Sequence, residues 1–196
     1  MGGTVSVYSL NIWVIASLLA LGPSQGAARK WTAPETFVAK AESRADATAV
    51  AAAPLTIQVD RYTKDADRTA MEEALRTGGY PGFLTKLRNA PAVGYVETAN
   101  RKFTIRWARQ VPDGEGRTIS IVTDAPIYFV GGGRPDAKPR EGYELAVLQL
   151  KMDSSGIGDG TMAAAARVKP GGTTGVTIDQ YADQPIKLVS VRREIK

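Results

Sequence analysis

Cysteine and histidine are both absent from this sequence of 196 residues. Without cysteine the chain can form no disulfide, no thiolate metal site and no catalytic thiol, and it cannot carry a lipid on an N-terminal cysteine. Without histidine it can perform no Ser-His-Asp or Cys-His catalysis, and nearly all zinc, copper and iron sites are excluded. Any catalysis is left to carboxylates, Lys, Tyr, Ser, Thr or Arg, and we expect no metal and no cofactor.

Aromatic residues are scarce, at 7% of the chain, and the basic residues form no dense stripe with aromatics between them. Nucleic-acid-binding proteins usually show such a stripe, so we expect no nucleic-acid partner. The 25 Lys and Arg residues against 20 Asp and Glu give a formal net charge of +5. This charge favours anionic surfaces such as acidic glycans or lipid headgroups, weakly and with a dependence on salt.

The N-terminal residues 1–28 are typical of a signal peptide. Residues 12–21 form an apolar run that is too short to span a bilayer comfortably, and small residues that suit cleavage after Gly26 or Ala28 follow a proline. No Lys or Arg precedes Arg29, which departs from the usual signal pattern, and an uncleaved membrane anchor is the alternative. We expect an exported, periplasmic or secreted protein with no transmembrane span after the signal is removed.

The remaining chain divides into two parts. Residues 29–54 are alanine-rich and polar, which predicts a flexible lead-in. Residues 55–196 are expected to form a single β-rich domain. Hydrophobic residues make up 43% of the chain and charged residues 23%, an ordinary globular composition that argues against wholesale disorder.

The domain begins with a strand and a helical region. Leu55–Asp60 alternates apolar and polar residues, as half-buried strands do. Two short helices follow, the first capped by Thr63 and ended by Gly78–Gly79, the second over residues 81–88.

The sequence after residue 91 alternates between strand patterns and turns rich in Gly and Pro, which predicts about seven further strands. The expected fold class is therefore α+β, a curved antiparallel β-sheet or barrel of about eight strands with two short helices after the first strand.

Five phrases together resemble a group of exported bacterial proteins that has no assigned activity. They are RYTKDADR, VGYVET, WARQVPDGEGRTISIVTDAPIYF, YELAVLQLKMDSSGIGDGTM and YADQPIKLVSVRRE. The resemblance runs from about Leu55 to the C-terminus and leaves out the leader. It implies a single secreted or periplasmic domain, and it assigns no catalytic or binding residue.

The stretch FVGGGRPDAKPREGY, residues 129–143, places three glycines after an apolar run. A phosphate-binding loop would end in Gly-Lys-Ser/Thr and open into a helix, whereas here Arg-Pro follows the glycines, so this reading is excluded. What remains is a long connection that carries a loose cationic cluster, Arg134, Lys138 and Arg140. A solvated link is the simpler interpretation. A lid that contacts a ligand through these three residues is the sharper one.

Two aromatic residues and one alanine-rich strand bear on a ligand inside a barrel. The small side chains of residues 162–168 either let a helix pack across the sheet or leave room for a small ligand. In the second case Ala163–Ala166 and Trp107 would border an enclosed apolar cavity. Trp107 and Tyr95 are thus candidate ligand contacts, with a place in the core as the simpler alternative.

Acidic residues give two further candidate sites. A turn at Asp153–Gly160 resembles a calcium loop but lacks the bidentate glutamate, so a glycine-rich hairpin turn is favoured. Five carboxylates in strands could supply a general acid–base pair. Salt-bridged outer-face positions opposite Arg106, Arg109 or Lys187 are the simpler interpretation. The five carboxylates are Asp60, Glu97, Asp124, Glu144 and Asp179.

These features favour a non-catalytic binding or structural module of the bacterial envelope or exterior. Its partner would be a small apolar ligand or an anionic envelope component. The alternative is a histidine-free hydrolase or isomerase that depends on two carboxylates.

Overall fold

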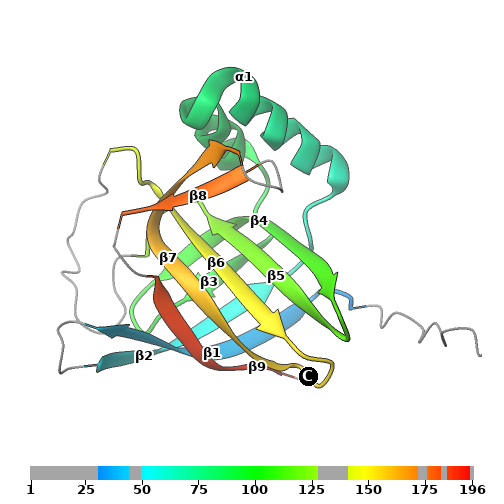
Figure 1. The fold of residues 1–196 in the computed structure, drawn as a ribbon, viewed down its shortest axis with the longest axis vertical. Coiled ribbons are helices and arrows are strands. Elements are labelled where there is room, and N and C mark those ends of the chain that lie inside the picture. The colour runs from blue at the N-terminus through cyan, green and yellow to red at the C-terminus, as the bar shows by residue number, and fades with distance from the viewer. Residues whose placement is uncertain (1–30, 45–49, 128–140, 172–175, 182–184, 195–196) are drawn as a thin grey trace, which may run out of the picture. The chain divides into compact units, whose positions relative to one another are not determined.

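The computed structural model describes residues 31–44, 50–127, 141–171, 176–181 and 185–194. Within these residues the chain forms nine strands and one helix (Figure 1). In chain order they are β1 (Glu35–Arg44), β2 (Val50–Val59), α1 (Asp65–Asn89), β3 (Gly94–Glu97), β4 (Lys102–Asp113), β5 (Gly116–Thr123), β6 (Leu145–Met152), β7 (Ile157–Pro170), β8 (Val176–Gln180) and β9 (Ile186–Glu194).

Eight of the strands close into an antiparallel barrel. Strands β1 to β7 each pair with the next strand in the chain, and this includes β2 and β3, which α1 separates in the sequence. Strand β9 lies between β7 and β1 and completes the ring. Strand β8 lies outside the ring and pairs with β7. The expected curved antiparallel sheet or barrel of about eight strands is confirmed, and it is a closed barrel. The seven strands expected after the helical region are β3 to β9.

The expected flexible lead-in over residues 29–54 is corrected by β1, which is a full barrel strand. It pairs with β2 in register from Glu35 opposite Val59 to Arg44 opposite Val50. Its inward side chains include Phe37, Ala39 and Ala41, all buried. These inward residues occupy every second position, as in any strand. Alanine is too small and too weakly apolar to make an alternation of apolar and polar residues conspicuous, so the sequence does not indicate this strand. Strand β2 likewise begins five residues before the expected Leu55.

The helical region is one helix, not two, and it follows the second strand. It is bent at Gly79, whose backbone is non-helical with φ 60° and ψ −160°, and Pro81 follows. The expected stop at Gly78–Gly79 therefore marks a kink that divides α1 into two arms. At Gly82 an added Cβ would lie 2.9 Å from the carbonyl oxygen of Ala74, so the missing side chain lets the arms approach closely.

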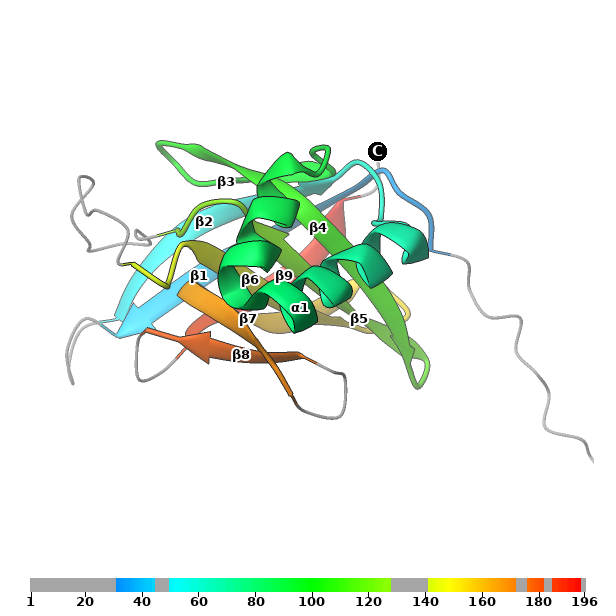
Figure 2. The ribbon, with the colours of Figure 1, turned by 90° about the horizontal axis from the view of Figure 1, so that it is seen from above.

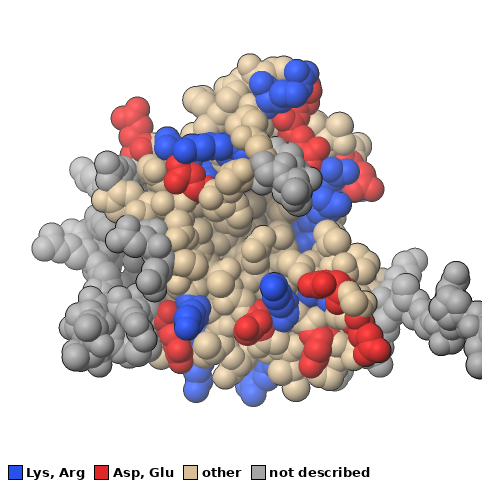
Figure 3. Space-filling view, in the orientation of Figure 1, with Lys and Arg blue, Asp and Glu red and all other residues tan. Residues whose placement is uncertain are grey.

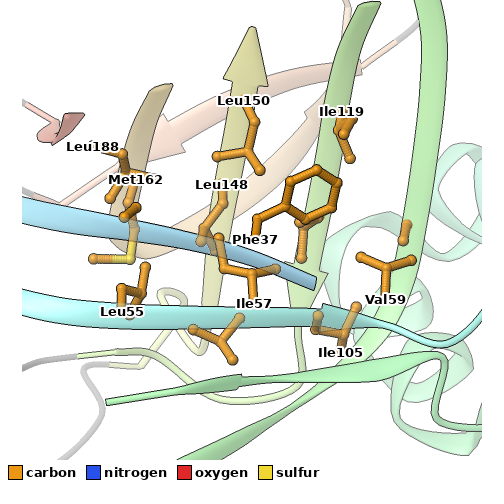
Figure 4. Close-up of a cluster of buried hydrophobic side chains, with 14 of the residues drawn as sticks. Phe37, Leu55, Ile57, Val59, Ile105, Ile119, Leu148, Leu150, Met162 and Leu188 are labelled. Carbon is orange, nitrogen blue, oxygen red and sulfur yellow. The ribbon is translucent and has the colours of Figure 1, made fainter. Parts of the chain in front are cut away.

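The barrel interior is filled by its own side chains, several of them fully buried (Figure 4). The residues that fill it include Phe37, Leu55, Ile57, Val59, Ile105, Ile119, Leu148, Leu150, Met162 and Leu188.

A second apolar cluster lies on the outer face, where α1 covers the barrel (Figure 2). Met71 and Leu75 from α1 contact a surface that includes Ala166, with Trp107 and Ala163 packed at its edge. The helix-packing interpretation of the alanine-rich strand is therefore confirmed at Ala163 and Ala166. Trp107, expected beside an interior cavity, lies outside the barrel instead. Within the described residues, no helix has the length and hydrophobicity that a membrane crossing requires.

Candidate functional site

The most deeply buried charges lie at the end of the barrel where β1 begins and β9 ends. Glu35, the first residue of β1, and Arg117 on β5 form an ion pair, and their side chains are 0% and 1% exposed. Arg117 donates to both carboxylate oxygens, from Nη2 to Oε1 at 2.7 Å and from Nη1 to Oε2 at 2.9 Å. Arg193 on β9 adds a third contact, with its Nε 2.9 Å from Oε1 of Glu35.

Two neutral side chains complete this group. Tyr62, in the link between β2 and α1, donates its hydroxyl to Oε2 of Glu35 at 2.5 Å. Gln110 at the end of β4 accepts a hydrogen bond from Nη1 of Arg117 at 2.6 Å. Burial, and then the hydrogen bond to Glu35, raise the pKa of Tyr62 well above its usual value, so its phenol remains a donor. We call these five residues the Glu35 cluster; it joins four strands and the link to α1.

A cleft of about 440 Å³ lies beside the Glu35 cluster, and Tyr62 belongs to both. The link between β2 and α1 forms one side of the cleft, with Arg61 and Lys64. The last turn of α1 and the following link form the other side, with Lys86 and Pro91. The kink at Gly79 brings these two ends of the helix to the same place on the barrel.

Four cations and one carboxylate line this cationic cleft: Arg61, Lys64, Lys86, Arg106 and Asp67. The side chains of Arg61, Lys64 and Lys86 are exposed and form no ion pair with any described residue. On the face shown in Figure 3, Lys and Arg side chains are interspersed with Asp and Glu side chains. Among the described residues that line the cleft, cations therefore outnumber carboxylates by four to one.

Arg106 has a different role from the other three cations, because it holds the cleft wall in place. Its Nε lies 2.8 Å from a carboxylate oxygen of Asp124, and its Nη1 donates to the carbonyl oxygen of Ala90 at 2.8 Å. Ala90 follows the last residue of α1 and lines the cleft. The second bond therefore fixes the end of the helix against β4.

The opposite wall is fixed by Thr63. Its hydroxyl oxygen accepts a hydrogen bond from the amide of Ala108 on β4 at 3.0 Å, and its own amide donates to the Ala108 carbonyl at 2.8 Å. The expectation that Thr63 caps α1 is therefore wrong. The capping position is Lys64, which makes no side-chain capping hydrogen bond. Tyr62 and Thr63, which lie between Arg61 and Lys64, therefore bind the link to the barrel, and this makes the cleft a formed feature.

The floor of the cleft is apolar. Met71 and Val93 both line it, and they are only 3% and 5% exposed. Met71 belongs to the cluster between helix and barrel, and Val93 to the cluster inside the barrel. The base of the cleft therefore meets two packed apolar clusters, and these two side chains present almost none of their surface to it.

Of the site residues expected from the sequence, those that the structure describes do not line this cleft. Arg134, Lys138 and Arg140 lie outside the described residues. Tyr95 lies half-buried on β3, with the Lys102 ammonium 4.4 Å from its ring centre. Trp107 packs against α1, and neither aromatic residue lines the cleft.

Each of the five expected carboxylates has structural contacts of its own. Glu97 pairs with Lys102 at 3.5 Å, and Asp124 pairs with Arg106 as described. Asp179 pairs with Lys169 at 2.7 Å and with Arg167 at 2.9 Å. Glu144 accepts hydrogen bonds from the Tyr80 hydroxyl at 2.7 Å and from the Gly142 backbone amide at 2.9 Å. Asp60 accepts a hydrogen bond from the side-chain amide of Gln58 at 3.1 Å. The salt-bridge interpretation is confirmed for Asp124 opposite Arg106.

The turn at Asp153 is a hairpin between β6 and β7, as favoured. One carboxylate oxygen of Asp153 accepts hydrogen bonds from the Ser155 hydroxyl (2.7 Å), the Ser155 amide (2.8 Å) and the Ile157 amide (3.0 Å). The hydroxyl bond, then the Ile157 amide, lower the pKa of Asp153. Within the described part of the chain, no group of three or more acidic residues is arranged to hold a metal ion.

Sequence reasoning missed the Glu35 cluster and the cationic cleft. One signal was present: Arg117 has the same parity as Ile119 and Ile121, which places a charge on the inward face of β5. The cleft cations carry no comparable signal, because they converge from segments about 20 residues apart only through the bend in α1.

The chain matches no protein-family model, no curated protein and no solved structure. A functional assignment therefore depends on the residues of the site.

Proposed function

We propose that this protein is an exported binding module of the bacterial envelope or exterior, and that its cationic cleft holds an anionic group of an envelope component. The signal-peptide pattern of residues 1–28 and the resemblance to exported bacterial proteins support the location. The observation that carries the binding role is the convergence of Arg61, Lys64 and Lys86 on one cleft with a single facing carboxylate, Asp67.

Electrostatics supports an anion as the occupant. Three exposed cations without ion pairs in the described structure repel one another, and a bound anion would relieve that repulsion. Because the mouth is open to solvent, the attraction is screened over roughly 10 Å at about 0.1 M salt, and binding should weaken as salt is added.

Catalysis by paired carboxylates has less support. The five candidate carboxylates have structural partners, and a further, more deeply buried carboxylate, that of Glu35, is paired with Arg117 and Arg193. A general acid or base needs a titrating group directed into a cleft, and among the described residues Asp67 is the one acidic residue lining the cationic cleft.

The test is an NMR titration of the chain with acetate at low ionic strength, with backbone amides as the readout. Amides of residues 61–64 and 86–90 should shift, and the shifts should fall when sodium chloride rises from about 20 mM to about 300 mM. The triple variant Arg61→Glu, Lys64→Glu, Lys86→Glu should lose the shifts.

The matched control reverses three exposed cations outside the cleft, Arg109→Glu, Lys151→Glu and Lys187→Glu. It changes the net charge by the same amount and should keep the response at residues 61–64. Equal loss in both triple variants would show an effect of net charge alone, and the proposed site would be wrong.

A further inference from the structure

We infer that the anionic group held by the cationic cleft is a compact dianion, the terminal phosphate of a phosphate monoester, and that the rest of the molecule bearing it stays outside. This inference rests on the proposed function and names the chemical class of the occupant. Two properties of the cleft carry it. One is the net charge of its unpaired side chains, and the other is the scarcity of groups that could recognise an organic body.

The charges that remain for an occupant sum to +2. Arg106 is already held in an ion pair, so it contributes no excess charge. The other charged residues described in the lining are three cations and one carboxylate: Arg61, Lys64, Lys86 and Asp67. A monoanion would leave an excess of positive charge in the cleft, whereas a dianion balances it. Because the Coulomb energy is proportional to the charge of the ligand, a second negative charge doubles the attraction to the cleft.

The three cations approach from two walls. Arg61 and Lys64 belong to the link before α1, and Lys86 belongs to its last turn. A phosphate monoester carries its two charges on three oxygens around one atom, so it can accept hydrogen bonds from both walls at once. A dicarboxylate must fix two ends that a carbon chain joins, and it loses more conformational freedom. The exposed Asn89 at the end of α1 adds an uncharged donor, its side-chain amide.

The cleft offers little to the rest of a ligand. Met71 and Val93 are only 3% and 5% exposed, so a hydrocarbon body would cover almost no apolar surface there. The hydroxyl groups of Tyr62 and Thr63 are already engaged in hydrogen bonds to the barrel. Recognition is therefore left to the charged side chains, and the group that they hold is the end of a molecule whose body extends out of the open mouth.

The test compares ligands of similar shape and different charge by NMR titration at constant ionic strength. At about pH 7.5 methyl phosphate is a dianion, while dimethyl phosphate carries a single charge. The dissociation constant of methyl phosphate should be at least about tenfold lower than those of dimethyl phosphate and acetate. Succinate, a dianion with separated charges, should bind more weakly than methyl phosphate.

A change of pH removes one charge from the ligand and leaves its heavy atoms in place. The second pKa of a phosphate monoester is about 6, so methyl phosphate is mainly a monoanion at about pH 5. Sulfate remains a dianion at both pH values and reports any change in the cleft itself. The dissociation constant of methyl phosphate, divided by that of sulfate, should rise about fivefold or more between about pH 7.5 and about pH 5. A constant ratio would overturn the inference.

The outcomes separate this inference from the proposed function. If methyl phosphate and dimethyl phosphate bind equally, or succinate binds as tightly as methyl phosphate, the inference is wrong and the anion-binding function stands. If no anion shifts the amides of the cleft, both are wrong.

A pair of variants locates the site by a gain of binding, which partial unfolding cannot imitate. Asp67→Asn removes the opposing carboxylate, so it should lower the dissociation constant of methyl phosphate about threefold or more, and that of dimethyl phosphate by less. Asp159→Asn is the matched control, because Asp159 is an exposed carboxylate on β7 that does not line the cleft. It changes the net charge by the same amount and should leave both constants unchanged. Equal gains in the two variants would show an effect of net charge alone, and the inference would be wrong.

A flotation assay distinguishes a lipid-borne phosphate monoester from a soluble one. Phosphatidic acid ends in a phosphate monoester, whereas phosphatidylglycerol carries a diester. Flotation with phosphatidic acid vesicles alone, released by excess methyl phosphate, assigns the group to a lipid. Flotation with neither kind of vesicle, together with the expected methyl phosphate binding, assigns it to a soluble molecule. Equal flotation with both would contradict the preference for a monoester.

Discussion

Glu35 and Arg117 are 82 residues apart in the chain, yet their side chains form two hydrogen bonds of 2.7 and 2.9 Å in a place closed to solvent. The pair connects the first strand of the barrel to the fifth across its end. A buried pair of this kind contributes little net stability over an apolar pair, but removing one partner leaves a buried charge without its counterion.

The first prediction is therefore that Glu35→Gln lowers the free energy of unfolding by about 3–5 kcal/mol. The variant leaves Arg117 facing a neutral amide, and Tyr62 loses its charged acceptor. The control Glu97→Gln, which breaks an exposed pair with Lys102, should cost less than about 1 kcal/mol. Urea unfolding measures both, and equal losses would show that the Glu35 cluster has no special role.

The second prediction concerns the approach of the two helix arms. Gly82→Ala should destabilise the protein by about 1–3 kcal/mol, because its Cβ would lie 2.9 Å from the Ala74 carbonyl oxygen and the arms must separate. Gly78→Ala is the control: its Cβ would meet nothing within 4 Å, and it should stabilise the helix by about 0.5–1 kcal/mol. Thermal unfolding followed by circular dichroism gives both signs, and a stabilising Gly82→Ala would contradict the close approach.

The third prediction is a pH effect at Glu144. Desolvation alone would raise the pKa of Glu144, but hydrogen bonds from the Gly142 amide and the Tyr80 hydroxyl outweigh it and hold the pKa below the ordinary 4.5. A lowered folded pKa contributes stability that is present above pH 4.5 and is lost as the pH falls through the folded value.

Tyr80→Phe removes one of these bonds, so the pKa of Glu144 should rise in an NMR titration. The stability difference from wild type should be largest at neutral pH and should narrow in acid. Tyr95→Phe, whose ring contacts Lys102 and not Glu144, should leave the Glu144 titration unchanged. An unaltered pKa in Tyr80→Phe would contradict the assignment.

The fourth prediction is that Thr63→Val destabilises the protein by about 1–3 kcal/mol, since the amide of the fully buried Ala108 would lose the side-chain acceptor that Thr63 provides. Thr69→Val is the matched control. The Thr69 hydroxyl bonds to the exposed Asp65 carbonyl within the helix, and its loss should change stability by less than about 0.5 kcal/mol. Urea unfolding of the two variants makes the comparison, and similar values would show that the link is not held through Thr63.

The fold could be predicted where apolar residues alternate with polar ones and turns are marked by glycine. The strand that ends in Val59 has this pattern, and the seven strands after the helix are separated by such turns, which predicts a curved sheet or barrel but leaves its closure open. Strand β1 lacks the pattern because two of its inward residues are Ala39 and Ala41. Its identity depends on pairing with β9, which is a contact between distant parts of the chain.

The candidate site was harder to predict than the fold. Arg117 could have been recognised from its inward parity, but its partner Glu35 lies in a segment without strand signals. In the sequence, Lys64 just before the helix and Lys86 near its end are ordinary surface residues. They face one cleft only because Gly79 bends that helix, and the direction of a bend is not encoded in local periodicity.

The position of β1 between β2 and β9 has a consequence for the order of assembly. A chain that has emerged only as far as β8 can form the sheet from β1 to β7, but it leaves an unpaired edge at both ends, and such edges invite pairing with other chains. The ring closes only when β9 joins β1 and β7. Because this step unites segments from the two extremes of the described chain, we expect closure to limit the folding rate, as it does in proteins of high contact order. Until then, the protein is an open sheet.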